Sequence, residues 1–177
     1  ILELLLEQLI ESGFTNFYIS VNYLKEKIIN YFEDGSRWNV NINYLIENKP
    51  LGTAGSISLL PKEIEKPFIV MNGDILTKFN LNQLIDFHNK NDSFTTICAR
   101  DYEVSIPFGV IETDGIELKR IVEKPIYKNY VNAGLYAFDP EVLKIFNKNE
   151  AKDMPDLINE IKELKKKVIL CPIHEYW

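Results

Sequence analysis

Residues 67–74 read Pro67-Phe68-Ile69-Val70-Met71-Asn72-Gly73-Asp74, an apolar run that ends in a glycine and a carboxylate. The apolar half predicts a buried strand, and the Gly-Asp that follows sets one carboxylate at the end of that strand. Sheets of α/β proteins bind ligands beyond the carboxyl ends of their strands. Asp74 is therefore the first candidate for holding a divalent metal against phosphate oxygens.

Strands and helices alternate around this run up to residue 92. The sequence predicts strands at 17–21 and 40–46, helices with apolar faces over 2–9, 24–32 and 81–88, and a short helix at 53–60. On the last of the three amphipathic helices His88 falls on the apolar face, which indicates a packed core histidine. Alternation at this short spacing is typical of βαβ units on a mostly parallel sheet, so we expect an α/β fold.

The pattern changes after residue 92, where helical spacing becomes rare. Asp114-Gly115 is a strong hairpin signal, and Asp153 is placed to cap a helix. The expected strands are 94–99, 109–112, 118–122, 131–138 and 168–170, and the expected helix is 154–164. No repeat, low-complexity stretch or linker interrupts the chain, so residues 1–177 are interpreted as a single domain.

Composition narrows the classes of function. The 177 residues carry a net charge of −6 and a pI of about 5.1, which argues against a nucleic-acid-binding surface. Cys98 and Cys171 give no disulfide framework and no zinc spacing, so free buried thiols in a reducing cytoplasm are expected. No apolar run is long enough to span a bilayer, so no membrane partner is expected.

The turn Pro50-Leu51-Gly52-Thr53-Ala54-Gly55 separates a predicted strand from a predicted helix. Two glycines with small neighbours let backbone N–H groups approach a ligand, and a helix N-terminus favours anions. The same residues also suit a tight turn whose small side chains pack closely on the sheet. From the residues themselves both interpretations stay open.

Three further segments combine polar residues with strand ends. Glu123-Lys124-Pro125 could present a carboxylate to sugar hydroxyls and an ammonium to a phosphate, although surface charge is the simpler interpretation. Asn132-Ala133-Gly134 enters an apolar strand, where a bulge is the simpler alternative to a ligand contact. Phe108-Gly109 invites the same two interpretations.

Together, five segments in order and at matching spacing resemble the sugar-nucleotide pyrophosphorylases, which join a nucleoside triphosphate to a sugar 1-phosphate. These segments are 51–55, 72–74, 108–110, 122–125 and 132–136. The resemblance implies a three-layer αβα, Rossmann-like fold with a mixed, mostly parallel sheet. The Leu-Gly-Thr-Ala-Gly turn is similar to members that make GDP-sugars, the mannose-1-phosphate guanylyltransferase type, and so favours GTP.

The resemblance also implies roles for particular residues. Asp74 would bind Mg²⁺ between phosphates and Lys124 would hold the sugar phosphate, and these two are the expected catalytic residues. Residues 1–92 would form the nucleotide-binding half, and residues 93–177 the sugar-phosphate-binding half. The expected nucleotide contacts are Leu51, Gly52, Thr53, Gly55 and Asp74; the expected sugar-phosphate contacts are Gly109, Glu123, Lys124 and Asn132.

Two parts of the family pattern would lie outside the sequence. A strand with a Gly-rich, triphosphate-wrapping loop would precede Ile1, and a second metal-binding Asp would follow Trp177. The expectation is a core truncated at both ends and inactive by itself, within a family whose members often self-associate. One alternative is a non-catalytic regulatory or binding subunit of the same fold. A glycosyltransferase is another, but Asn72-Gly73-Asp74 lacks the paired carboxylates expected there.

Overall fold

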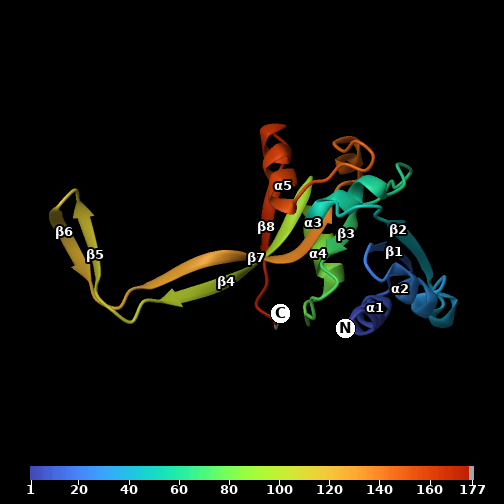
Figure 1. Ribbon diagram of the computed structural model, residues 1–177, viewed down its shortest axis with the longest axis horizontal. Coiled ribbons are helices and arrows are strands. Elements are labelled where there is room, and N and C mark those ends of the chain that lie inside the picture. Colours follow the sequence, from blue (N-terminus) through green and yellow to red (C-terminus); the bar gives the residue numbers. More distant parts are fainter. Residues whose placement is uncertain (176–177) are drawn as a thin grey trace.

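The computed structural model describes residues 1–175, which form three sheets (Figure 1). One sheet pairs β1 (Asn16–Val21) with β2 (Asn41–Ile46). The central sheet has the order β3 (Phe68–Met71), β7 (Ile126–Phe138), β4 (Thr95–Ser105), β8 (Val168–Pro172). The third is a hairpin of β5 (Val110–Asp114) and β6 (Glu117–Val122). Tyr176 and Trp177, after which the second metal carboxylate was expected, lie outside the described residues.

Strand directions agree with the expected mixed, mostly parallel sheet. β4 runs parallel to β8, and β7 runs antiparallel to both β3 and β4. Three of the four central strands therefore share one direction, and β7 alone is reversed between two of them. The β1–β2 pair is parallel as well. The mixed α/β class predicted from the spacing of strands and helices is confirmed.

Alternate residues of β7 build the two cores that flank the central sheet. Leu135 and Ala137 join the cluster that contains Leu81 and Leu84 of α4 (Leu81–Lys90). Tyr136 and Phe138 join the opposite cluster with α5 (Met154–Glu163), α3 (Gly52–Gly55) and η2 (Ser56–Leu59). Because successive strand side chains point to opposite faces, one strand serves both cores, and the layers are helix, sheet, helix.

The remaining helices cover the β1–β2 pair and the loops. α1 (Leu2–Glu11) and α2 (Lys25–Phe32) supply Leu6 and Phe32 to a third cluster over β1 and β2. The short helices are η1 (Ser36–Trp38) and η3 (Pro140–Lys144). Among residues 1–175, no helix combines the length and apolarity needed to cross a membrane.

Residues 100–131, called the arm here, leave the body of the molecule (Figure 1). The outer parts of β4 and β7 stay paired from Ala99–Asn132 to Ser105–Ile126, and the β5–β6 hairpin continues beyond them. The predicted strands 94–99 and 131–138 were too short. The extra residues are exposed on both faces, so they carry no buried apolar pattern that periodicity could detect.

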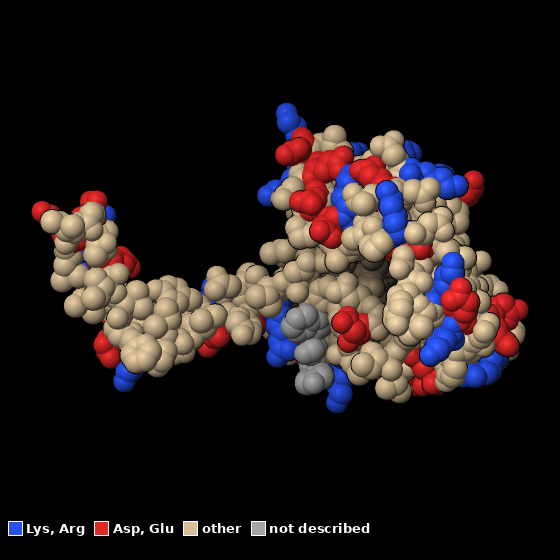
Figure 2. Space-filling model, in the orientation of Figure 1, with Lys and Arg blue, Asp and Glu red and all other residues tan. Residues whose placement is uncertain are grey.

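Large apolar side chains are exposed along this arm. Tyr102, Phe108 and Tyr130 are all more than half exposed, and Ile116 at the hairpin tip is fully exposed. Figure 2 shows that uncharged residues cover most of the arm's visible face. A two-stranded ribbon with little buried area is held mainly by its own ladder.

The buried titratable side chains have structural roles. His88 is 1% exposed and its Nδ1 lies 2.9 Å from the Thr96 hydroxyl, so the predicted core histidine is confirmed. Burial lowers the pKa of His88 from its ordinary value. Cys98 and Cys171 are free and buried, as predicted, and are register partners on β4 and β8.

Candidate functional site

Asp74 stands in the turn that follows β3. The Asn72 N–H donates to the Gly134 carbonyl at 3.1 Å, and the Ile75 N–H donates to the Asn72 carbonyl at 3.3 Å. Ile75 is buried, which anchors the turn, whereas Asp74 is exposed. Within residues 1–175 no hydrogen bond or ion pair engages the Asp74 carboxylate, so its oxygens are available to a ligand.

A bulge in β7 brings Asn132 beside this turn. Three residues of β7 separate Asn132 from Tyr136, whereas one residue of β4 separates their partners Ala99 and Ile97, which confirms the predicted bulge. Gly134 adopts φ +70°, and a Cβ there would lie 2.7 Å from the Asn72 side-chain nitrogen. The bulge therefore needs a glycine.

The Asn132 amide is oriented by two contacts. Its Oδ1 accepts from the Gly134 N–H at 2.9 Å, and its Nδ2 donates to the Tyr136 hydroxyl at 2.6 Å. Burial raises the pKa of Tyr136, and the hydrogen bond from Asn132 opposes that shift only in part. The hydroxyl stays protonated at neutral pH and can donate to a ligand.

The two glycines of the 51–55 turn are explained by close packing. A Cβ on Gly52 (φ +78°) would lie 2.7 Å from Asp153 Oδ1, and one on Gly55 would lie 2.7 Å from the Glu150 carbonyl oxygen. Leu51 is buried. The tight-turn interpretation is thus confirmed as a structural fact, and it is compatible with ligand contact by Thr53, which is exposed.

These elements line an open cavity of about 540 Å³, a size typical of small-molecule sites. It is lined by Thr53, Asn72, Asp74, Ile75, Leu76, Asn132, Ala133, Gly134, Tyr136, Met154 and Pro155. The structure therefore brings together Thr53, Asp74 and Asn132, three of the residues singled out in the sequence. Leu51, Gly52 and Gly55 lie in the same turn as Thr53 but do not line the cavity.

The other predicted sugar contacts form a second group on the arm. A Cβ on Gly109 would lie 3.1 Å from Glu123 Oε2, and the Lys124 N–H donates to the Phe108 carbonyl at 3.2 Å. Lys124 adopts φ +45° where β6 ends. Gly109, Glu123 and Lys124 are thus neighbours of one another beside β5 and β6. Figure 1 shows these two strands far from β3, α3 and α5, the elements around the cavity.

Sequence reasoning missed the part that α5 plays in the site. Asp153 was expected to cap this helix, and it does occupy the N-cap position, but its side chain makes no capping hydrogen bond. The Thr53 hydroxyl instead accepts from the Met154 N–H at 2.8 Å. A cap supplied from a distant turn leaves no local signal in the sequence.

The donor set suits Mg²⁺ only together with a ligand. No group of three His, Cys, Asp or Glu side chains that could hold a metal occurs in residues 1–175. Asp74 supplies a single free carboxylate beside an otherwise neutral cavity wall. Mg²⁺ commonly binds through one or two carboxylates plus substrate phosphates, so the residues present fit a metal that arrives with a nucleotide.

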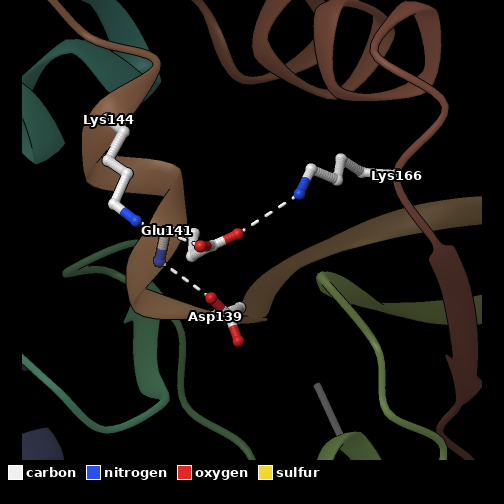
Figure 3. A network of polar contacts seen from close by, with 4 residues as sticks. All are labelled: Asp139, Glu141, Lys144 and Lys166. Atoms are coloured by element: carbon white, nitrogen blue, oxygen red, sulfur yellow. Dashed lines mark hydrogen bonds and ion pairs between the residues drawn. The ribbon is translucent and has the colours of Figure 1, made fainter.

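A second cluster of charges lies just beyond Phe138, the C-terminal residue of β7 (Figure 3). Glu141 accepts from Lys144 at 3.0 Å and from Lys166 at 3.2 Å, and the Asp139 carboxylate accepts from the Glu141 N–H at 2.8 Å. The two lysines hold the pKa of Glu141 below its ordinary value. These charges largely satisfy one another.

Comparisons with known proteins all find nucleotidyltransferases. A family model described as Nucleotidyl transferase matches residues 1–172. Mannose-1-phosphate guanyltransferase 2 of Candida glabrata is 34% identical over 168 residues, covering 88% of this chain and 46% of that protein. The Saccharomyces cerevisiae mannose-1-phosphate guanyltransferase is 32% identical over 168 residues, with the same coverage of 88% and 46%. The chain thus spans about half the length of these relatives.

Solved structures agree on the fold. HddC from Yersinia pseudotuberculosis has a TM-score of 0.71 at 23% identity, over 97% of this chain and 76% of that one. A structure of HddC complexed with GMP-PN has a TM-score of 0.72 at 22% identity, over 99% of this chain and 77% of that one.

Proposed function

Because the chain belongs to the nucleotidyl transferase family, we propose that it is the core of an enzyme joining GTP to a sugar 1-phosphate, which yields a GDP-sugar and pyrophosphate. The observation that carries the proposal is the free carboxylate of Asp74 in one cavity with Thr53 and Asn132. The relatives named mannose-1-phosphate guanyltransferase support GTP and mannose 1-phosphate as the first substrates to test.

In this reaction an oxygen of the sugar phosphate attacks the α-phosphorus of the nucleotide, and pyrophosphate leaves. Such chemistry depends on positioning and on neutralising phosphate charge. Members of the family generally use a divalent metal. Asp74 would hold Mg²⁺, which supplies charge neutralisation when bound. The cavity wall that includes Thr53 and Pro155 would position the nucleotide beside Asp74.

The residues predicted to bind the nucleotide and those predicted to bind the sugar phosphate would contact different parts of the substrates. Thr53 would contact the nucleotide directly, while Leu51, Gly52 and Gly55 would shape the turn that presents it. Asn132 would contact the sugar from β7. The cavity thus draws Thr53 and Asp74 from residues 1–92 and Asn132 from residues 93–177, which supports a nucleotide half and a sugar-phosphate half.

Gly109, Glu123 and Lys124 would complete the sugar-phosphate site from the arm. For Lys124 to act with Asp74, the hairpin has to approach the cavity when substrates bind. A two-stranded ribbon with both edges free can bend at lower cost than the four-stranded sheet.

A cytoplasmic location is also proposed, since the two cysteines are free. Self-association remains part of the proposal, and no nucleic-acid partner is proposed for an acidic chain.

A second candidate is a non-catalytic binding subunit of the same fold. The separation of Glu123 and Lys124 from Asp74 favours this candidate. In a catalyst all three side chains would have to contact the same bound NTP and sugar 1-phosphate. The Asp74 carboxylate favours the enzyme, because it lines the cavity and has no partner among residues 1–175, so it could hold a metal against substrate phosphates.

Pyrophosphate release separates the two candidates. The full-length polypeptide that contains this chain would be mixed with Mg²⁺, each of the four NTPs and a panel of sugar 1-phosphates. We expect release with GTP and a sugar 1-phosphate. Folded protein that releases no pyrophosphate with any pair would exclude the enzyme and leave the binding subunit.

A further inference from the structure

Asp153 contacts the turn 51–55 but does not line the cavity. Its Oδ1 accepts from the Thr53 N–H at 3.0 Å and lies 3.4 Å from the Thr53 hydroxyl. The same hydroxyl accepts from the N–H of Met154, the first residue of α5, at 2.8 Å. Thr53 and the start of α5 therefore hold each other in place through Asp153.

Main-chain hydrogen bonds extend this contact into a short ladder. The Ala54 N–H donates to the Lys152 carbonyl at 2.9 Å, and the Lys152 N–H donates to the Leu51 carbonyl at 2.8 Å. The Lys152 ammonium is in turn fixed by Glu150 at 2.7 Å and Glu160 at 2.6 Å. The segment 150–153 thus forms a rigid backing for the turn 51–55.

Because Gly52 has no side chain, the Asp153 carboxylate can lie directly against the turn 51–55. A Cβ on Gly52 would lie 2.7 Å from Asp153 Oδ1, so the turn and the carboxylate are in direct contact. Thr53, Met154 and Pro155 all line the cavity, and Asp153 links them, since it precedes Met154 along the chain and accepts the hydrogen bond of the Thr53 N–H. A shift of the Asp153 carboxylate would therefore change the shape of the cavity beside Thr53 and Met154.

We propose that Asp153 is a positioning residue for the nucleotide: it sets the turn 51–55 against the start of α5. The proposal rests on the proposed function. Loss of the carboxylate leaves the Thr53 N–H without its acceptor and loosens the turn at Thr53, while the hydrogen bonds of Leu51 and Ala54 to Lys152 remain. The nucleotide then binds a less ordered wall. Asn132 is held by Gly134 and Tyr136, and within residues 1–175 no hydrogen bond links it to Asp153, so we expect the sugar side to stay unchanged.

The test compares KM for GTP with KM for the sugar 1-phosphate in the full-length protein. Asp153→Ala should raise KM for GTP about tenfold, because the loosened turn has to be ordered when GTP binds, with kcat and the other KM within about twofold. Asp153→Asn keeps the acceptor oxygen and should restore most of the affinity. Asp156→Ala is the matched control, an exposed carboxylate on the same helix without a hydrogen-bond partner among the described residues.

The outcomes separate cleanly. Wild-type protein without turnover would defeat the proposed function, and the dissociation constant for GTP, measured by titration calorimetry, would then replace KM in the same comparison. Turnover in wild type together with an unchanged KM for GTP in Asp153→Ala would overturn the positioning role, as would equal rises in both KM values. Should Asp153→Ala fail to fold, Asp153→Ser keeps an N-cap residue but is too short to reach Thr53, and the same KM comparison applies to it.

Discussion

At the scale of single residues, the sequence was enough to predict that Asp74 follows a strand end. The sequence did not predict the contact with Gly134 that holds the turn before Asp74. An apolar run followed by Gly-Asp marks a strand end, and sheets of this class bind ligands there. Gly134, which holds Asn72 and so the turn before Asp74, comes from a strand far along the chain. Its need for a positive φ depends on that tertiary contact, and the sequence shows only a glycine near a strand.

Gly134→Ala should destabilise the protein and weaken the site. The new Cβ would meet Asn72 and Ile75 at 2.7 Å in a backbone conformation that L residues rarely adopt. We expect a loss of about 2–4 kcal/mol in the free energy of unfolding, measured by urea titration. Gly115→Ala is the control, with φ +59° and nothing within 4 Å, and should lose only about 1 kcal/mol. Equal losses would show that the contact with Asn72 is unimportant.

At the scale of elements, apolar periodicity predicted the helices and the buried strands, but it did not predict the arm. Residues 101–105 of β4 are exposed on both faces, so their side chains carry no alternation between core and solvent. The strand continues because its partner continues, from Ala99–Asn132 outward. Pairing between distant segments is a tertiary property, which explains why both strands were predicted too short.

The arm carries the prediction that concerns the sugar phosphate. Lys124→Ala should raise KM for the sugar 1-phosphate about tenfold and leave KM for GTP unchanged, because an ammonium at this hairpin would pair with the sugar's phosphate. Lys119→Ala is the control on the same hairpin, where Lys119 pairs with Asp114 at 3.4 Å, and should change neither value. An effect of Lys124→Ala confined to GTP would refute the assignment.

At the scale of the whole molecule, the layered α/β arrangement follows from the alternation of strand and helix patterns. The position of β7 between β3 and β4 does not, because apolar runs say nothing about which strands are neighbours. The five resembling segments pointed to one site, but the structure divides them between the cavity and the hairpin. Local sequence thus singled out the candidate residues, and the long-range pairing of β4 and β7 determined their separation.

Asp74 gives the most direct test of the whole account. Pyrophosphate release by the full-length protein, with GTP, Mg²⁺ and a sugar 1-phosphate, would be compared between wild type and Asp74→Asn. A variant that melts like wild type but turns over about 100-fold more slowly is the predicted result, because the amide is a poor ligand for the metal. Asp86→Asn, on the exposed side of α4, should match wild type. Unchanged turnover in Asp74→Asn would contradict the metal role of Asp74 and the catalytic cavity built around it.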